Sequence, residues 1–190
     1  MKRSLLISAI AVTTAMMMGG GAAVADPIFQ ATLNGANEVP PNASTTTGLS
    51  IATLTGNTLT IDETLSGLSS PATEAHIHCC APPGGSSGVA ISFPGFPAAT
   101  SGTYTQSFDL TNPTVYNAAF LAANGGTVTG AEAALIAGLE TVTAYANIHD
   151  ATFPEGEISG WYYAVPEPAS LVLFASALLG LGLMRRRSRD

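Results

Sequence analysis

Hydrophobic and polar residues alternate in several stretches along the middle of the chain, and this period of two predicts short β-strands. Two adjacent runs, GLSIATLT from Gly48 and TLTIDETL from Thr58, are separated only by Gly56 and Asn57. Both of these residues tolerate the positive φ of a tight turn, so we expect a hairpin there. The other runs that predict strands cover residues 28–33, 74–80, 89–93, 103–110, 141–149 and 157–163.

The last of these runs, EISGWYY, contains Trp161 and Tyr163 two residues apart. They therefore share one face of the predicted strand, and we expect both to point to the core or to a partner strand. We expect Trp161 to anchor the core rather than to provide a platform for a ligand.

The pattern changes between residues 111 and 140, where alanine is frequent and the strand alternation stops. Pro113 follows Asn112, and proline is tolerated in the first turn of a helix. Thr129 stands three residues before Glu132, the spacing of a capping box, ahead of the run AALIAGLE. We therefore predict two short helices inserted into a mainly β fold, whose roughly eight strands favour an antiparallel Greek-key sandwich or barrel.

All three histidines of the chain fall in two of the predicted strands. His76 and His78 lie in EAHIHCC and should project from one face, while Ala75 and Ile77 turn into the core. His149 ends the run TVTAYANIH and shares its face with Thr143, Tyr145 and Asn147. If the two strands are neighbours, the three imidazoles converge, and imidazole is the usual ligand of Zn, Cu, Fe or Ni. The alternative is that they are ordinary hydrogen-bonded structural histidines.

The only two cysteines, Cys79 and Cys80, are adjacent and follow His78 directly. Neighbouring cysteines cannot connect distant parts of a chain, so the protein is not a disulfide scaffold. Three possibilities remain for the pair: a vicinal disulfide, two free thiols, or additional ligands of a metal site.

Charge is distributed unevenly along the chain. All six basic residues lie in its first three and last six residues, whereas eleven of the thirteen acidic residues lie between residues 26 and 164. This middle part has no basic patch to offer phosphate groups, so nucleic acid is excluded as a partner, and anionic polysaccharide or lipid is disfavoured.

The N-terminal residues have the order of a secretory signal peptide. Lys2 and Arg3 precede an apolar run, and small residues then lead to Ala23-Val24-Ala25. We predict that residues 1–25 are removed by signal peptidase and that the mature protein lies outside the cytoplasm.

At the other end, Pro166-Glu167-Pro168 precedes a short apolar run and then a cluster of arginines. The arginines would keep this end cytoplasmic. Residues 165–190 resemble the PEP-CTERM sorting signal of Gram-negative bacteria. The resemblance implies recognition by a membrane exosortase and transient anchoring of the C-terminal helix in the inner membrane. It also implies delivery to the periplasm, outer surface or extracellular matrix, usually in organisms that make exopolysaccharide. The alternative is a plain C-terminal transmembrane anchor.

Several motifs between these ends occur in a specific order: FQATLNGANEVPP, Ser69-Ser70-Pro71, AHIH, NIH and GEISG. In this order they resemble the CHRD domain, named for chordin and common in bacterial secreted proteins. The resemblance covers nearly all of residues 26–164 and implies a largely β domain, but CHRD domains are mostly of unknown biochemical activity. Glu38 lies in the first motif, and such an acidic residue can orient a metal-binding histidine.

The His-x-His pair with a late histidine also resembles the copper face of Cu/Zn superoxide dismutases. That resemblance implies copper bound by His76, His78 and His149 in an immunoglobulin-like or dismutase-like sandwich. However, there is no fourth histidine to bridge a second metal, and between residues 26 and 164 no arginine to attract an anionic substrate.

Two functions therefore remain open. The first is an exported binding or structural module of the envelope or extracellular matrix, with a histidine site for copper or another transition metal and with Glu38, Asn147 and Glu157 in support. The alternative is a copper-dependent enzyme of the superoxide dismutase type. A third possibility is calcium bound by Asp150, Glu155 and Glu157, although the recognised loop spacing is missing.

Overall fold

The computed structural model describes residues 26–166 and residue 178. The predicted signal peptide lies outside the described residues, as do Glu167, Pro168 and nearly all of the predicted C-terminal helix. Among the residues that are described, no helix has the length and apolar character needed to cross a membrane.

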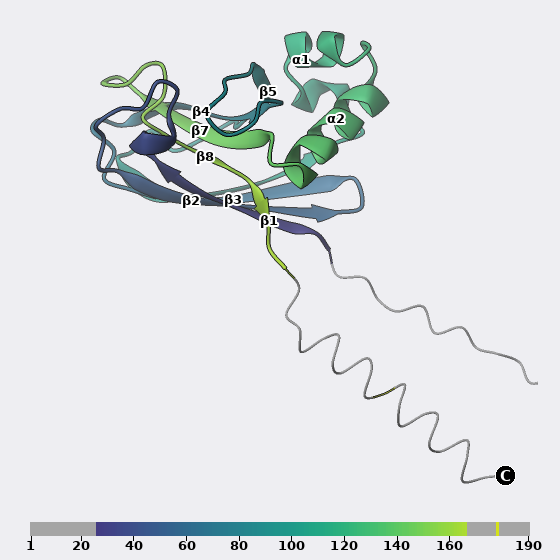
Figure 1. Ribbon diagram of the computed structural model, residues 1–190, viewed down its shortest axis with the longest axis horizontal. Coiled ribbons are helices and arrows are strands. Elements are labelled where there is room, and N and C mark those ends of the chain that lie inside the picture. Colours follow the sequence, from purple (N-terminus) through teal and green to yellow (C-terminus); the bar gives the residue numbers. More distant parts are fainter. Residues whose placement is uncertain (1–25, 167–177, 179–190) are drawn as a thin grey trace, which may run out of the picture.

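The strands form one antiparallel sheet that curls over on itself (Figure 1). Their order across the sheet is β5-β4-β7-β8-β1-β2-β3-β6, and β9 pairs with β1 outside this sequence. The mainly β, antiparallel fold with a two-helix insertion is thus confirmed. The strands are β1 Ile28–Asn34, β2 Thr47–Thr55, β3 Thr58–Ser66, β4 Ala72–Cys79, β5 Val89–Ser92, β6 Ser101–Asp109, β7 Ala144–Asp150, β8 Ile158–Trp161 and β9 Tyr163–Ala164.

Because the sheet curls, β4, β7 and β8 lie over β1, β2 and β3, and the hydrophobic core fills the space between the two layers (Figure 1). Strands β1, β2 and β3 give alternate residues to this core, as the period of two predicts, whereas β7 and β8 are buried along almost their whole length. The fully buried aliphatic side chains include Leu33, Leu59, Ile61, Ile77, Ile148 and Ile158.

The predicted hairpin is present, because Thr55 pairs with Thr58 across Gly56 and Asn57. Gly56 has a φ of 57°, in the region that glycine adopts without steric cost.

The insertion between β6 and β7 contains the 3-10 turn η2 Pro113–Val115 and the helices α1 Ala118–Ala123 and α2 Val128–Glu140. The predicted capping box at Thr129 is wrong by two residues. Helix α2 begins at Val128, and its N-cap is Thr127, whose side chain accepts a hydrogen bond from the Gly130 amide. Both threonines precede the same apolar run, so their spacing alone could not distinguish them.

The prediction for the last strand was half right. Trp161 is buried and donates from Nε1 to the carbonyl of Ala81, but Tyr163 is exposed. The aromatic residue in the core is Tyr162, which is fully buried. The strand alternation therefore places Tyr162 inward, and Trp161 on the opposite face beneath a loop.

The two ends of the folded domain meet at β1 and β9. Phe29 pairs with Ala164, and the Val165 amide donates a hydrogen bond to the carbonyl of Ile28. All described strands, both described helices and the core lie between residues 26 and 166. This segment therefore has the hydrophobic core expected of an independently folding unit.

Candidate metal centre

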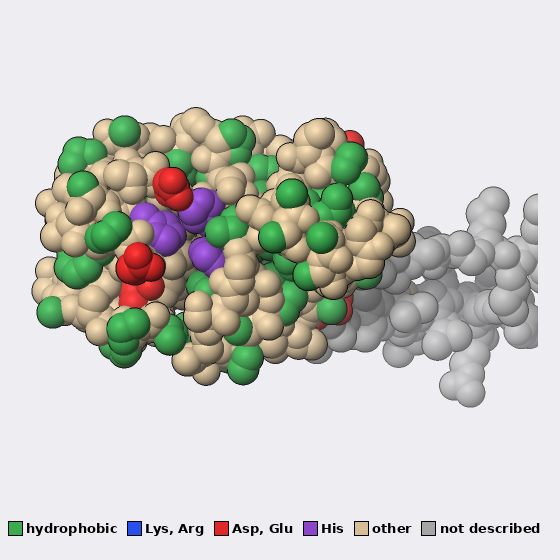
Figure 2. All heavy atoms as spheres, turned by 90° about the horizontal axis from the view of Figure 1, so that it is seen from above, with side chains coloured by type: hydrophobic (Ala, Val, Ile, Leu, Met, Phe, Trp, Pro, Cys, Tyr) green, Lys and Arg blue, Asp and Glu red, His purple; other side chains and the backbone are tan. Residues whose placement is uncertain are grey.

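The predicted neighbourhood of the two histidine strands is confirmed. Strands β4 and β7 pair in antiparallel register, with Glu74 opposite His149 and His76 opposite Asn147. Because alternate residues share a face, the three rings gather on the outer face of the sheet, where the space-filling view shows them at the surface with acidic side chains on either side (Figure 2). Ala75 and Ile77 are buried in the core on the other face, as predicted.

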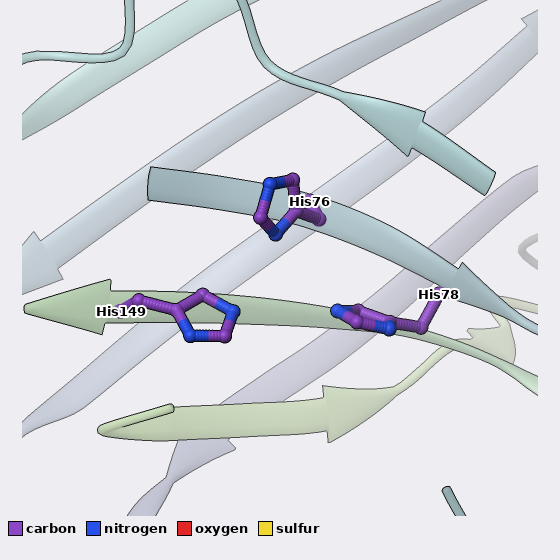
Figure 3. Close-up of side chains that lie close together, drawn as sticks. All are labelled: His76, His78 and His149. Atoms are coloured by element: carbon purple, nitrogen blue, oxygen red, sulfur yellow. The ribbon is translucent and has the colours of Figure 1, made fainter. Parts of the chain in front are cut away.

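The three rings face a common space (Figure 3). Their centroids are 5.2 Å apart for His76 and His149, 5.7 Å for His76 and His78, and 6.3 Å for His78 and His149. One ring nitrogen from each residue lies within 4.8 Å of the others. Nitrogens bound to one tetrahedral ion at ~2.1 Å are about 3.4 Å apart, so a small inward movement of the rings would close the site.

Hydrogen bonds to the protein fix the orientation of two of the rings. His78 Nδ1 lies 2.8 Å from the carbonyl oxygen of Ser87, and His149 Nδ1 lies 3.0 Å from that of Pro154. A carbonyl oxygen only accepts, so each Nδ1 carries the proton and each Nε2 keeps its lone pair. This is the arrangement in which a histidine is prepared to bind a metal through Nε2.

A carboxylate lies beside the third ring. His76 Nε2 lies 3.4 Å from Glu74 Oε2, which leaves Nδ1 free. The nitrogens that face the common space are His76 Nδ1, His78 Nε2 and His149 Nε2, and all three are buried without a hydrogen-bond partner among the described residues. Buried polar atoms of native proteins are nearly always paired, so three orphaned nitrogens in one place need an explanation.

Burial also favours the neutral form of His76 and His78. For His76, burial together with the smaller effects of the neighbouring His149 and His78 lowers the pKa to about 4, because protonated rings repel each other. Burial likewise lowers the pKa of His78, although the hydrogen bond to Ser87 opposes the shift. Neutral imidazoles with free lone pairs are the form that a metal ion needs.

Asn147 lies on the same face of the sheet as the three rings, and Glu38 lies beside Asn147. Asn147 is on β7 between His149 and Tyr145, and the ring of His78 stacks on Tyr145 at 4.8 Å. A Cβ atom on Gly156 would lie 2.6 Å from Glu38 Oε2 and 2.7 Å from Asn147 Oδ1. The carboxylate and the amide are therefore close neighbours, packed against the bare backbone of Gly156.

Glu157, the third predicted supporting residue, acts elsewhere. It is fully buried and accepts hydrogen bonds from Ser44, Thr46 and Ser69. Asp150 is likewise buried and accepts from Ser70 and from the Phe153 amide. These donors occupy the carboxylate oxygens that calcium would need, so the two residues hold loops together instead.

The cysteines lie apart from the histidines. Cys79 and Cys80 form a vicinal disulfide, and both sulfurs lie near the carbonyl of Ala134 on α2. A Cβ on Gly138 would collide with Cys79 Sγ, so this glycine allows the helix to approach the disulfide closely. The only group within residues 26–166 and residue 178 that could hold a metal ion is the histidine trio.

Three contacts of the site were missed by reasoning from the sequence: Glu74 beside His76, and the carbonyls of Ser87 and Pro154. Glu74 could have been found, because it lies two residues before His76 and so shares its face of the strand. The carbonyls could not, because both belong to loops whose course no sequence periodicity describes.

Comparison with protein-family models matches the CHRD domain to residues 29–161 and the PEP-CTERM protein-sorting motif to residues 164–187. No curated protein and no solved structure matches the chain.

Proposed function

This chain belongs to the CHRD domain family and is an exported protein with a motif for exosortase sorting, and on that premise we propose that it is an envelope or extracellular-matrix module that binds one transition-metal ion. His76, His78 and His149 are the proposed ligands. Glu74 and the carbonyls of Ser87 and Pro154 hold the rings in place.

The observation that carries this proposal is the set of three buried ring nitrogens that face one space and have no hydrogen-bond partner within residues 26–166. An apolar packing role would not require the opposite nitrogen of each ring to be held by an acceptor. Metal-binding histidines, in contrast, nearly always donate their other N–H to a carboxylate or a carbonyl.

The ligand set favours zinc or copper, since neutral imidazole suits both ions, whereas calcium and magnesium require oxygen ligands. Three protein ligands also leave a position open for water or another small ligand.

A superoxide dismutase activity is less well supported than binding. Residues 26–164 carry eleven carboxylates and neither lysine nor arginine. Such a surface repels an anionic substrate, whereas fast superoxide chemistry depends on an attractive field. If the copper-loaded domain nevertheless disproportionated superoxide much faster than free copper does, a superoxide dismutase function would replace the proposed binding function.

Metal analysis tests the proposal directly. Residues 26–166, prepared without a histidine tag and dialysed against zinc or copper, should retain about one ion per chain. The triple variant His76→Ala, His78→Ala, His149→Ala should retain none. Ser92→Ala provides the matched control, because this exposed residue pairs with His76 on the neighbouring strand. Equal metal content in the triple variant and the wild type would contradict the proposal, provided that circular dichroism shows both to be folded.

The sorting motif leads to a separate expectation about location. Removal of residues 166–190 should change where the exported domain accumulates, because exosortase would have nothing to recognise. Fractionation of cells that express the full chain or the truncated chain measures this, with Glu140→Gln as a full-length control on an exposed helix end. Identical distribution of the two chains would rule out a sorting role for the motif.

A further inference from the structure

Eight buried side-chain nitrogen and oxygen atoms have no hydrogen-bond partner among the described residues, and their positions are not random. Two belong to Glu63 in the core. The other six are the three ring nitrogens His76 Nδ1, His78 Nε2 and His149 Nε2, together with Ser87 Oγ, Glu38 Oε1 and Asn147 Oδ1. A bound ion would account for the three nitrogens but not for the oxygens of Glu38 and Asn147.

The carboxylate of Glu38 is held in this place by its loop. The loop passes through the 3-10 turn η1 Gly35–Asn37, and Asn37 Nδ2 donates to the carbonyls of Thr32 and Ser159. Asn42 Nδ2 donates in turn to the carbonyls of Gly156 and Glu157. The loop is thereby pinned to β8 and to the segment that also supplies the Pro154 carbonyl to His149. The loop that carries Glu38 and the segment that holds the His149 ring are therefore fixed to each other.

Asn147 links the two groups in space. It is the cross-strand partner of His76 and lies two residues before His149 on the same face of β7. On its other side it pairs with Ser159 of β8, and its amide lies beside Glu38 at Gly156. Cross-strand partners on one face are ~5 Å apart, so Asn147 lies close to His76 on one side and close to Glu38 on the other.

We propose that Glu38 is the general base of a metal-assisted hydrolytic centre, with a neutral ester or a similar uncharged acyl compound as substrate. This inference rests on the proposed metal site. A water on the open position of the ion attacks the carbonyl carbon while its O–H bond breaks and its proton passes to Glu38 Oε1. The bond to the leaving alcohol then breaks, and the alkoxide takes the proton back from Glu38.

This assignment gives both orphaned oxygens a partner. The metal-bound water would donate one O–H to Glu38 Oε1 and the other to Asn147 Oδ1. Zinc in a site with three protein ligands activates water near neutral pH, and a positioned carboxylate is a common base for such a water. The histidine side chains reach the surface of the domain (Figure 2).

The acidity of Glu38 suits this role. Burial raises the pKa of Glu38 to about 7, against the opposing effect of the Ser159 hydroxyl. A base with a pKa near the working pH is efficient, because it is present as carboxylate and still binds a proton well. Other ionisable groups around it are His149 on β7, and Glu155 and Glu157 in the adjoining segment. Glu157 is turned to its own donors, and Glu155 is exposed.

The substrate class follows from charge. The three histidines lie on a domain without lysine or arginine and have acidic side chains beside them (Figure 2). Phosphate esters and other anions are therefore disfavoured, while neutral acyl compounds meet no repulsion.

The experiment uses residues 26–166 loaded with zinc and 4-nitrophenyl acetate as the probe. The wild type should hydrolyse it faster than free zinc, with a rate that rises with pH as Glu38 loses its proton. In Glu38→Gln we expect kcat/KM to fall by about 100-fold or more, with loss of this rise but unchanged zinc content. Glu155→Gln removes an equal charge from a nearby exposed position and should behave like the wild type.

Each outcome has a distinct meaning. A wild type that binds zinc but hydrolyses no faster than free zinc overturns this inference and leaves the metal site standing. The same follows if Glu38→Gln keeps full activity and the same pH profile. A wild type that binds no zinc overturns the metal site and the inference together. Glu38→Asp, which keeps the carboxylate, should retain part of the activity and the rise with pH, and failure of this rescue in a folded variant also counts against the base.

Discussion

Glu157→Ala should destabilise the domain by about 4 kcal/mol, which is a large part of the stability of a single domain. The Glu157 carboxylate lies 2.6 Å from Ser44 Oγ, 2.8 Å from Thr46 Oγ1 and 2.8 Å from Ser69 Oγ, and it also accepts from the Ser69 amide. Hydrogen bonds to a charged group are the stronger kind, and alanine would leave these buried donors unpaired.

Urea unfolding of residues 26–166 measures this loss. Glu157→Gln should have an intermediate effect, because its amide keeps one acceptor oxygen but turns an NH2 group toward donors. Glu155→Ala, two residues away and exposed, should change the free energy of unfolding by less than about 0.5 kcal/mol. A loss below about 1 kcal/mol for Glu157→Ala would show that water replaces the carboxylate easily and that the residue does not hold the loops.

Glu63→Gln should stabilise the domain, and the gain in the free energy of unfolding should depend strongly on pH. Glu63 is 1% exposed among the aliphatic side chains of β3, and neither of its oxygens has a hydrogen-bond partner in the part of the chain that the structure describes. Burial raises the pKa of Glu63 to about 8, with a smaller opposing effect of the Ser50 hydroxyl. The folded protein therefore keeps this carboxyl protonated at neutral pH, whereas the unfolded chain, with the ordinary value of 4.5, has lost the proton.

The sign of the pH dependence follows from this difference. The stability that Glu63 contributes is fully present below pH 4.5 and decreases as the pH rises to about 8, at ~1.4 kcal/mol per pH unit for one proton. Glutamine resembles the protonated form and has no such dependence. The difference in unfolding free energy between Glu63→Gln and the wild type should therefore grow by about 3 kcal/mol between about pH 5.5 and 8.5.

Comparison of the two proteins at each pH cancels the contributions of other groups, such as Glu38. Urea unfolding provides the measurement, and Glu140→Gln, at the exposed end of α2, is the control that should show no change in this difference. A difference that stays constant across this range would mean that Glu63 is ionised in the folded protein and that the buried position is hydrated.

Strand periodicity predicted a large part of this structure. It placed His76, His78 and His149 on one face and Ala75 and Ile77 in the core, and it located the hairpin at Gly56. The same rule puts Glu63 on the inward face with Leu59 and Ile61, so its burial was readable from the sequence although it breaks the hydrophobic pattern. A charged residue at a core position is an exception that periodicity identifies but does not explain.

Other features could not be read from the sequence. The partners of Glu157, and Ser70 as a partner of Asp150, come from loops that are distant in sequence and close only in the folded domain. Thr127 competes with Thr129 as a cap, and the choice depends on how α2 packs against β4 and β7. The orientation of each imidazole depends on single carbonyl groups in irregular loops, and no local pattern determines them.

The pairing of β9 with β1 brings Ile28 and Val165 into contact, so the chain enters and leaves the domain at the same end. Any membrane anchor that follows residue 166 would therefore attach to the domain at this end. The three histidines lie on the outer face of β4 and β7, away from this end (Figure 1), so they would still face the surroundings while the protein is anchored in the bilayer.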